Sequence, residues 1–335
     1  MKAVAYQQCH ELSDNVMLED IELPLPAAGA SDIVVKIEAI SVNPVDTKIR
    51  RSVDAAPGQY KVLGWDAAGV VTETGSEVSL FSVGDKVWYA GAIDRQGTNA
   101  EYHVVDQRIV AKMPASLSFT EAAALPLTAI TAWELLFDRL AISENENATL
   151  LVIGAAGGVG SVLIQLAKQL TQLNIIATAS KPQSQQWVRN LGADQVINHR
   201  DSLTTGLAAI GIEQVDYIIS LTNTAQHLDA IHTLIKPQGK FALIDDPGVL
   251  DVMPFKRKSV SIHWEFMFTR SLFQTADMIK QHQLLDRLAK LIDQGKIKTT
   301  LNEDFGSINA ANLRRAHQLI ESGQVTGKIV LSGFE

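Results

Sequence analysis

The sequence is poor in cysteine, with a single one, Cys9, among its 335 residues. A lone cysteine excludes a disulfide within the chain, and it excludes a structural zinc site built from three or four thiolates. Long apolar runs are also missing, because no stretch reaches the roughly 18 residues that a membrane-spanning helix needs. The first residues lack the apolar segment of a secretion signal, so we expect a cytoplasmic protein without a membrane partner.

An excess of positive charge is absent as well. The formal net charge is -8 at pH 7 and the isoelectric point is about 5.5. These values argue against nucleic acid or an anionic membrane surface as the main partner. The length of 335 residues exceeds what one hydrophobic core usually supports, so we expect two domains.

The first third of the chain is rich in short β-type runs separated by turn-forming glycine, proline and aspartate. The pattern predicts strands at residues 33–40, 68–72, 86–89 and 100–105. A helix is expected over residues 121–140. The composition before this helix is typical of an irregular, β-rich domain.

Strands and helices then alternate strictly. The predicted strands are residues 149–153, 175–179, 195–198, 217–220, 240–244 and 259–264, and the predicted helices are residues 159–169, 183–191 and 224–235. Continuous apolar strands that alternate with amphipathic helices indicate an α/β fold, a doubly wound parallel sheet covered on both faces.

The alternation stops after residue 266. A long helix is predicted over 273–294, a second over 310–322, and a closing strand over 328–331. We expect this tail to return to the β-rich domain. The predicted domains are therefore residues 1–123 with 266–335, and residues 124–265.

A glycine-rich turn joins the strand at 149–153 to the following helix. Its residues 155–160 match the dinucleotide fingerprint G-x-G-x-x-G, with alanine at the first position. Gly157 would let the backbone approach a pyrophosphate, and Gly160 would let the helix pack close to the strand. The helix N-terminus offers N–H groups to phosphates. A merely tight turn is the alternative, but the surrounding alternation favours a dinucleotide site made by Ala155, Ala156, Gly157, Gly158, Val159 and Gly160.

The end of the next strand indicates which dinucleotide binds. NAD-binding folds usually place an acidic residue about 20 residues after the turn, where it holds the ribose 2′-hydroxyl. Here the strand ends in Ser180 and Lys181, without a carboxylate. A hydroxyl and an ammonium suit a 2′-phosphate, so the sequence favours NADPH, although Lys181 could also be an ordinary loop lysine.

Several segments together resemble the medium-chain dehydrogenase/reductase superfamily over essentially the whole chain. They are residues 41–46 (SVNPVD), 64–71 (GWDAAGVV), 84–87 (GDKV), 126–129 (PLTA), 155–160 (AAGGVG), 191–194 (LGAD) and 198–200 (NHR). The chain looks most like the zinc-independent quinone oxidoreductase branch, similar to zeta-crystallin. Residues 263–268 (HWEFMF) further resemble the subgroup of zinc-type alcohol dehydrogenase-like proteins.

This resemblance implies a Rossmann domain for NADP and a GroES-like catalytic domain. It also implies a homodimer, formed when the sixth strands of two cofactor sheets join. Residues 259–264, with Val260, Ile262 and Trp264, fit such a strand. The cofactor-binding residues that the resemblance implies, besides the turn, are Leu127, Thr128, Ser180, Lys181, His199, Leu221, Thr222, Asn223, Ile244, Asp245, Phe266, Phe268 and Lys328.

The zinc site of related alcohol dehydrogenases has no counterpart in the sequence. The positions of its two cysteines and its histidine correspond, by resemblance, to Asn43, Ala124 and Trp65. None of them offers a thiolate or an imidazole, and residues 84–105 lack the cysteines of the structural zinc lobe. We therefore expect no metal.

Alcohol oxidation without zinc lacks the ion that lowers the pKa of the hydroxyl group. Quinones and α,β-unsaturated carbonyls instead accept hydride at an electron-poor carbon and form a delocalised anion, so positioning and hydrogen bonds supply much of the assistance. We expect NADPH-dependent reduction of such a substrate. Two alternatives stay open: an NADP-dependent alcohol dehydrogenase or aldehyde reductase, and a non-catalytic NADPH-binding protein.

Four residues are candidates for contact with the substrate. Asn43 donates to the substrate oxygen in this hypothesis, or merely forms the turn before Pro44. Asp46 is a second candidate, with a structural carboxylate paired to Lys48 or Arg50 as the alternative. Trp65 either walls an aromatic pocket or packs in the core, and Tyr60 is a weak candidate for a proton donor, a role that water can also fill.

Overall fold

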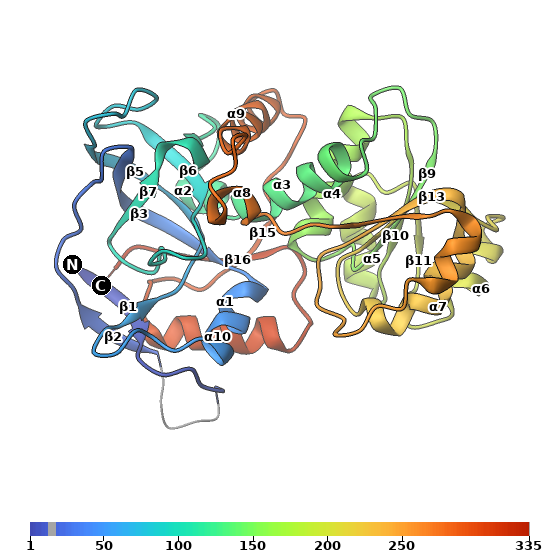
Figure 1. The fold of residues 1–335 in the computed structure, drawn as a ribbon, viewed down its shortest axis with the longest axis horizontal. Helices are drawn as coiled ribbons and strands as arrows, with labels where there is room; N and C mark the ends of the chain where they lie inside the picture. The colour runs from blue at the N-terminus through green and yellow to red at the C-terminus, as the bar shows by residue number, and fades with distance from the viewer. Residues whose placement is uncertain (13–17, 335) are drawn as a thin grey trace. The chain divides into compact units, whose positions relative to one another are not determined.

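The computed structural model describes residues 1–12 and 18–334. The chain divides into two compact units (Figure 1). One consists of residues 1–130 together with 268–335, and the other of residues 131–267. No described helix combines the length and the apolar character that crossing a membrane requires.

The first unit is built on β-sheets. Its larger, seven-stranded sheet has the order β15-β16-β3-β5-β6-β8, and β7 pairs with β3 as well. These strands are β3 (Asp32–Val42), β5 (Asp66–Thr74), β6 (Lys86–Ala90), β7 (Tyr102–Asp106), β8 (Val110–Lys112), β15 (Leu301–Asp304) and β16 (Lys328–Ser332). A smaller sheet contains β2 (Glu19–Glu22), β1 (Lys2–Tyr6) and β4 (Lys61–Val62).

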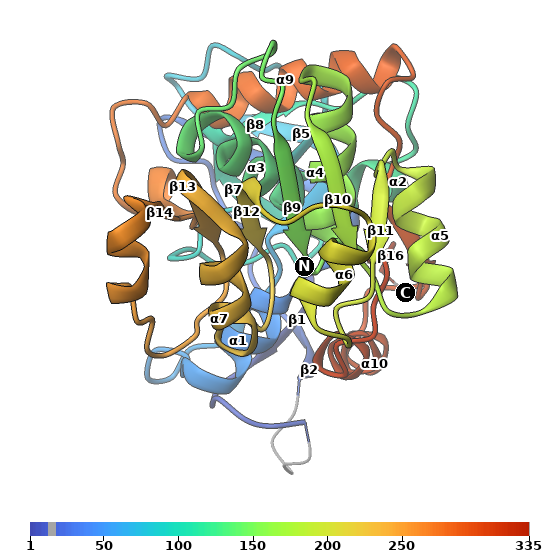
Figure 2. The same ribbon diagram turned by 90° about the vertical axis from the view of Figure 1, so that its right-hand side faces the viewer.

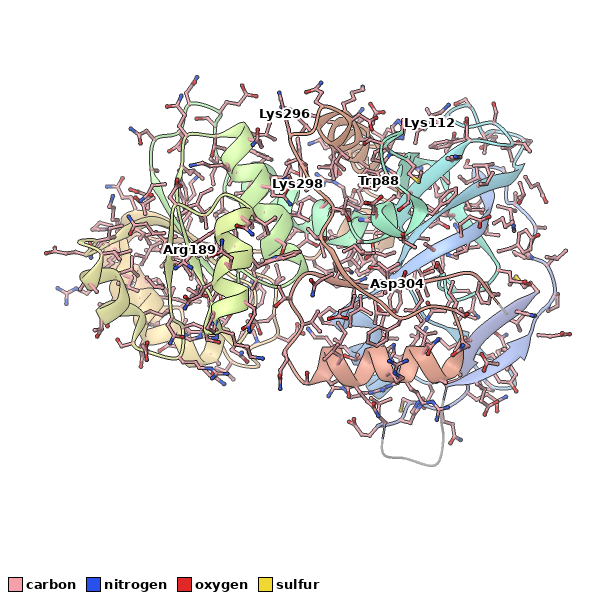
Figure 3. All side chains as sticks on the ribbon, turned by 180° about the vertical axis from the view of Figure 1, so that it is seen from behind. Trp88, Lys112, Arg189, Lys296, Lys298 and Asp304 are labelled. Carbon is pink, nitrogen blue, oxygen red and sulfur yellow. The ribbon has the colours of Figure 1, made fainter. Side chains whose placement is uncertain are left out.

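Strands inside this sheet are buried along most of their length, and polar side chains lie toward the strand ends. In β6, Trp88 is fully buried, whereas Lys112 on the neighbouring β8 is exposed and forms an ion pair with Asp85 (Figure 3). The last strand, β16, pairs antiparallel with β3, with Ile329 opposite Val42. The C-terminal segment thus completes a sheet begun about 300 residues earlier in the chain, which loop-closure entropy permits because its cost grows only slowly with loop length.

Helices of the first unit are α1 (Pro44–Ser52), α2 (Phe119–Ala123), α8 (Thr269–Leu272), α9 (Lys280–Asp293) and α10 (Ala310–Glu321), with the 3-10 turn η1 (Gln107–Ile109). Helix α1 and strand β15 were not expected from the sequence. The long helix predicted over 273–294 is wrong at its start, because a short helix and irregular residues precede Lys280. Gln274, with φ of 49°, breaks the helical path there.

The helix predicted over 121–140 is also divided. It consists of α2, α3 (Pro126–Trp133) and the π-helical segment η2 (Glu134–Arg139). Pro126 separates the first two pieces, because proline lacks an N–H group and disfavours the helical conformation of the preceding residue.

The second unit contains one parallel sheet of six strands in the order β11-β10-β9-β12-β13-β14 (Figure 2). The strands are β9 (Thr149–Ile153), β10 (Asn174–Thr178), β11 (Gln195–Ile197), β12 (Val215–Ser220), β13 (Ile235–Leu243) and β14 (Ser261–Trp264). Its helices are α4 (Gly158–Leu170), α5 (Pro182–Asn190), α6 (Leu203–Ala209) and α7 (Thr224–Leu234), with the 3-10 segment η3 (Met253–Lys258). The predicted fold class, a doubly wound parallel sheet beside a β-rich domain, is confirmed.

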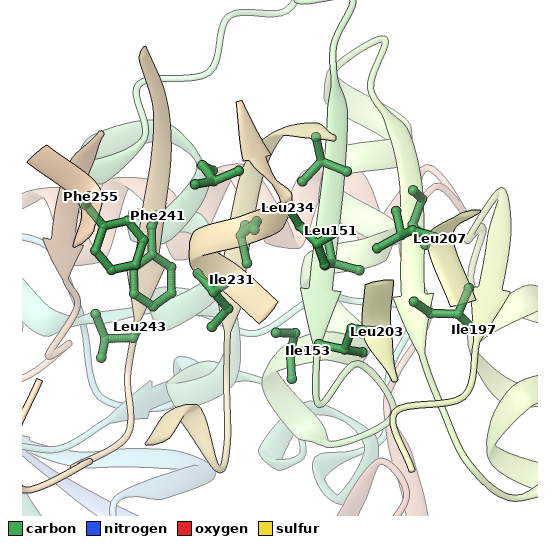
Figure 4. Packing of buried hydrophobic residues seen from close by; sticks show 14 residues of the cluster. Leu151, Ile153, Ile197, Leu203, Leu207, Ile231, Leu234, Phe241, Leu243 and Phe255 are labelled. Atoms are coloured by element: carbon green, nitrogen blue, oxygen red, sulfur yellow. The ribbon is translucent and has the colours of Figure 1, made fainter. Parts of the chain in front are cut away.

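Apolar side chains of the strands and helices form the core of this unit (Figure 4). Leu151 and Ile218 from the sheet are fully buried, as is Ile231 from α7. Phe241 stacks on Phe255 with ring centroids 5.8 Å apart. Burial of one such side chain stabilises the fold by about 1.5–3 kcal/mol, so this core holds the strand ends in fixed relative positions.

Candidate functional site

The glycine-rich turn lies directly after β9, in the second unit. Gly154 has a φ of 79°, a conformation that favours glycine. Its backbone N–H donates to Thr178 Oγ1 at 3.1 Å, which ties the turn to the end of β10. The turn therefore spans the ends of two neighbouring strands.

Two glycines of the turn differ in what surrounds them. A Cβ on Gly160 would lie 2.3 Å from the carbonyl oxygen of Ala155, so only glycine lets α4 approach the turn this closely. A Cβ on Gly157 would meet nothing closer than 3.7 Å, so packing does not require glycine there. Gly157 is the N-cap residue of α4 and has no side chain to bond the first N–H groups of that helix. The turn thus leaves space and hydrogen-bond donors beside Gly157, which fits a phosphate group.

Most of the predicted cofactor residues follow the ends of parallel strands in this unit. Parallel strands bring their carboxyl ends to one edge of the sheet, where ligands of such folds bind. Because β10 and β12 lie on opposite sides of β9, the connections diverge at the turn. The residues brought to this edge are Ser180, Lys181, His199, Leu221, Thr222, Asn223, Ile244, Asp245 and Phe266. Leu127, Thr128, Phe268 and Lys328 instead belong to the first unit.

Ser180 and Lys181 lie between β10 and α5. Lys181 is exposed and is the N-cap residue of α5, and its backbone N–H donates to Ser184 Oγ at 3.2 Å. His199 follows the neighbouring strand β11, and partial burial lowers the pKa of its imidazole. Its Nδ1 atom is buried without a hydrogen-bond partner. A hydroxyl, an ammonium and an imidazole therefore follow two adjacent strands.

Asp245 has a structural role in addition to any contact with a cofactor. Its carboxylate accepts the backbone N–H of Thr224 at 2.8 Å and also accepts a hydrogen bond from the Thr224 hydroxyl. These bonds hold the first turn of α7 after Asn223, which has a left-handed φ of 52°. The negative charge of Asp245 is stabilised there by the positive, N-terminal end of the α7 dipole.

In the first unit, a buried polar cluster surrounds Asp66. The side chains of Asp66, Asn43 and Lys328 are at most 4% exposed. Lys328 Nζ lies 2.9 Å from Asp66 Oδ2, donates to Val42 O at 3.1 Å, and also donates to Asn43 Oδ1. An ammonium has three N–H donors, so these acceptors use all of them.

Asn43 is likewise occupied within the cluster. Its Nδ2 donates to Asp66 Oδ2 at 2.8 Å and makes a longer contact of 3.5 Å with Ser41 O. Its Oδ1 accepts from Lys328. The nitrogen and the oxygen of the Asn43 amide therefore both bond to side chains of the first unit.

Asp46 begins the neighbouring helix α1. Its carboxylate accepts the backbone N–H of Asn43 at 2.8 Å, and burial raises its pKa to about 7. The hypothesis that Asp46 pairs with Arg50 is wrong, because the Arg50 guanidinium pairs with Glu321. Asp46 caps the start of α1, whereas Arg50, one helical turn further along, contacts Glu321 of α10.

Asp66 is the centre of the cluster, and the sequence did not identify it. Its second oxygen, Oδ1, accepts the backbone N–H of Leu127 at 2.7 Å, at the start of α3. Thr128, the next residue, is buried and donates to Leu125 O at 2.9 Å. The available signal in the sequence was an acidic residue inside the apolar segment 64–71. A charge is rarely buried without a partner, so such a residue needs one if the segment is buried.

The two remaining candidates lie in packed surroundings. Trp65 is 1% exposed, donates its indole N–H to Ala92 O at 3.1 Å, and meets the Phe268 ring edge-on at 6.0 Å. Tyr60 is partly buried and packs on the small apolar cluster that contains Ala3 and Val62. Both side chains thus have packing roles in the first unit.

The positions that correspond to zinc ligands do not fit a zinc ion. Within residues 1–12 and 18–334, no three His, Cys, Asp or Glu side chains are grouped so that they could hold a metal. Asn43 is bonded to an ammonium, Trp65 presents an indole N–H, and Ala124 has only a methyl side chain. Both nitrogens of buried His103 are bonded, to Tyr89 Oη and to Gln96 O. No thiolate or available imidazole lies at these positions, in contrast to known zinc sites.

Comparisons with known proteins agree with this fold. Residues 29–115 match the alcohol dehydrogenase GroES-like domain, and residues 191–331 match the zinc-binding dehydrogenase family. A zinc-type alcohol dehydrogenase-like protein from Staphylococcus aureus (strain MSSA476) is 41% identical, over 99% of this chain and 100% of its own. A mitochondrial NAD(P)H oxidoreductase from Mus musculus is 30% identical, over 96% of this chain and 85% of its own.

Solved structures show the same relationship. A Rhizobium etli CFN 42 protein, described as a zinc-dependent alcohol dehydrogenase, has 51% identity and a TM-score of 0.97, covering 100% of this chain and 98% of its own. Escherichia coli quinone oxidoreductase complexed with NADPH has 26% identity and a TM-score of 0.83, with coverage of 99% and 100%. Both full-length similarity and the two matching domains lead to one assignment: the chain belongs to the medium-chain dehydrogenase/reductase superfamily, among the zinc-type alcohol dehydrogenase-like proteins.

Proposed function

We propose that this oxidoreductase uses NADPH to reduce quinones or α,β-unsaturated carbonyls, and that it does so without zinc. The observation that carries the proposal is the buried cluster of Asp66, Asn43 and Lys328. In this cluster the Lys328 ammonium bonds to Asn43, which stands at one zinc-ligand position, and to Asp66, which follows another at Trp65.

The turn at residues 154–160 supports the binding of a dinucleotide. The N-terminus of α4 offers N–H groups beside the space at Gly157, and these groups would bind the pyrophosphate. Ser180, Lys181 and His199 would surround a 2′-phosphate at the ends of β10 and β11. When bound, the reduced nicotinamide supplies a hydride.

Absence of suitable zinc ligands limits the substrates that accept this hydride easily. A simple aldehyde or ketone needs an electrophile that stabilises the developing alkoxide, which zinc provides in metal-dependent enzymes. A quinone or enone distributes the developing charge over its own conjugated system. The chain then mainly orients the reactants, and solvent can supply the proton that completes the reduction.

Aldehyde reduction is the second candidate, because the Staphylococcus aureus relative is named a zinc-type alcohol dehydrogenase-like protein. The two candidates differ in substrate and in metal dependence. We expect NADPH oxidation with 1,4-quinones or enones that survives treatment with a chelator, in protein whose zinc content is below stoichiometric. Activity that is confined to aldehydes and lost with the chelator would overturn the proposal.

A non-catalytic role has a separate outcome in the same assay. Tight NADPH binding without turnover of quinones, enones or aldehydes would show that the fold serves as a binding protein.

The resemblance contributes one further proposal, a homodimer formed through β14. This strand lies at the edge of the six-stranded sheet, and Trp264 on it is 53% exposed. Light scattering should give twice the chain mass for the wild type, and Trp264→Glu should shift the protein toward the monomer.

A further inference from the structure

We infer that Arg139 and Glu265 form a positioning pair that directs the ring of Phe266 toward the nicotinamide end of the cofactor. The inference rests on the proposed binding of NADPH. It assigns a role to residues 263–268, the segment HWEFMF, which the phosphate turn and the Asp66 cluster leave unexplained.

The pair joins two elements of the second unit. Arg139 Nε donates to Glu265 Oε2 at 2.6 Å, and Arg139 Nη2 lies 3.6 Å from Glu134 Oε2. The two glutamate side chains are at most 1% exposed, whereas that of Arg139 is 30% exposed. One guanidinium thus links the segment after β14 to the helical segment η2.

The π-helical form of η2 is what brings Glu134 and Arg139 together. Its hydrogen bonds join residues five apart, as in the 3.0 Å bond from the Leu140 N–H to Leu135 O. In an α-helix, residues three or four apart share a face, so residues five apart diverge. The π segment therefore brings Glu134 beside Arg139, whose guanidinium also bonds to Glu265.

From Trp264, the last residue of β14, to Met267 the side chains alternate between exposed and buried positions. Trp264 and Phe266 are 53% and 46% exposed, whereas Glu265 and Met267 are each 4% exposed. The backbone N–H of Glu265 also donates to Leu243 O at 3.0 Å, so the segment continues the direction of the strand. With Glu265 anchored inward by Arg139, an extended backbone must direct Phe266 outward.

The position of Phe266 on the sheet indicates which end of the dinucleotide it meets. The phosphate turn follows β9, and the adenosine ribose of such cofactors binds at the end of the next strand, β10. The rest of the dinucleotide must then extend in the other direction, over β12, β13 and β14. Phe266 follows the last of these strands, so its ring lies on the nicotinamide side.

An exposed phenylalanine ring there can contact the flat nicotinamide ring. Aromatic pairs add a favourable interaction beyond the burial of their surface, which can change a dissociation constant by up to about tenfold. The ring acts on the nicotinamide half only. It therefore should not affect a ligand that carries the adenosine half alone.

The test compares two ligands by isothermal titration calorimetry: NADPH, and adenosine 2′,5′-bisphosphate, which lacks the nicotinamide. In Phe266→Ala we expect NADPH to bind about tenfold more weakly, while binding of the fragment stays within about twofold. Arg139→Met and Glu265→Gln should show the same split. Phe273→Ala, which removes another exposed phenylalanine ring, in the first unit, is the matched control and should leave both ligands unaffected.

Equal weakening of both ligands would overturn the inference, because it would indicate general damage to the domain. Unchanged NADPH binding in Phe266→Ala, or in both Arg139→Met and Glu265→Gln, would overturn it as well. Because Arg139→Met leaves two buried carboxylates without their guanidinium, Glu265→Gln is the decisive test of the pair. Phe266→Ala tests the ring contact itself in a fold whose core is untouched.

Failure of the proposed function looks different. If the wild type prefers NADH, the same split between NADH and AMP would support the positioning pair and reject the assignment of Ser180 and Lys181. If the wild type binds no dinucleotide, both proposals are overturned.

Discussion

The carboxylate of Asp66 connects two parts of the first unit: one oxygen receives the Lys328 ammonium at 2.9 Å, and the other receives the backbone N–H of Leu127 at 2.7 Å. One buried charge thus joins the C-terminal strand β16 to the beginning of α3. Because Lys328 is the counter-charge, the orientation of the Leu127–Thr128 segment depends on an ion pair and not on apolar packing alone.

Breaking this ion pair should be costly. In Lys328→Met the Asp66 carboxylate stays buried without its ammonium, and we expect the free energy of unfolding in urea to fall by about 3–5 kcal/mol. Asp66→Asn should lose a comparable amount. The double variant should be more stable than the sum of the two losses predicts. Strictly additive losses would show that Asp66 and Lys328 stabilise the fold independently.

The two glycines of the turn should respond differently to alanine. Gly157→Ala should keep its stability within about 0.5 kcal/mol, because the new Cβ meets nothing closer than 3.7 Å. It should nevertheless bind NADPH at least about tenfold more weakly, which corresponds to about 1.4 kcal/mol. Calorimetric titration and thermal unfolding of the same sample measure both quantities.

Gly160→Ala is the matched comparison for that variant. Its Cβ would lie 2.3 Å from Ala155 O, so the thermal midpoint should fall. A Gly157→Ala protein that binds NADPH like the wild type would contradict the placement of the phosphates beside Gly157.

Lys181 should govern the choice between NADPH and NADH. Lys181→Glu places a carboxylate near the expected 2′-phosphate, and we expect the ratio of kcat/KM for NADPH to that for NADH to fall at least about tenfold. Steady-state rates with both cofactors provide the measurement. Lys296→Glu, a change at an exposed lysine of the other unit, serves as the control for altered net charge. A similar fall in Lys296→Glu would contradict a local role of Lys181.

His317 should make stability depend on pH. Burial lowers the pKa of its imidazole to about 3, whereas the unfolded chain titrates near 6.5. As the pH falls below 6.5, the unfolded state gains a proton that the folded state does not accept, so stability decreases. This group alone should cost about 2 kcal/mol between pH 7 and pH 5.

The variant His317→Leu isolates that contribution, because the free energy of unfolding should then fall less between pH 7 and pH 5. Buried His103, whose pKa is lowered to about 4, acts in the same direction and stays in both proteins. Identical pH profiles of wild type and variant would contradict the prediction.

Periodicity predicted the elements whose burial pattern is regular. The alternating strands and helices of the second unit, including β9 and β12, follow from apolar runs bounded by turn residues. The π-helical segment Glu134–Arg139 did not follow, because its sequence has no pattern that differs from an α-helix. Helix α1 was missed inside a region dominated by β-type runs.

The candidate site divides in the same way. Strand-end residues such as Ser180 could be placed from the sequence, because parallel strands align their ends. The partners of Asn43 could not, because Lys328 lies 285 residues away and reaches Asn43 only through the pairing of β16 with β3. Long-range pairing of this kind leaves no local pattern.

The different constraints on Gly157 and Gly160 provide a way to read the history of related chains. A descendant that no longer binds a dinucleotide still needs Gly160, because its own backbone would clash with any larger residue. Gly157 is free to change once no ligand approaches it. A relative that has lost the glycine at position 157 but kept the one at position 160 would therefore be one that retains the fold and no longer binds the cofactor.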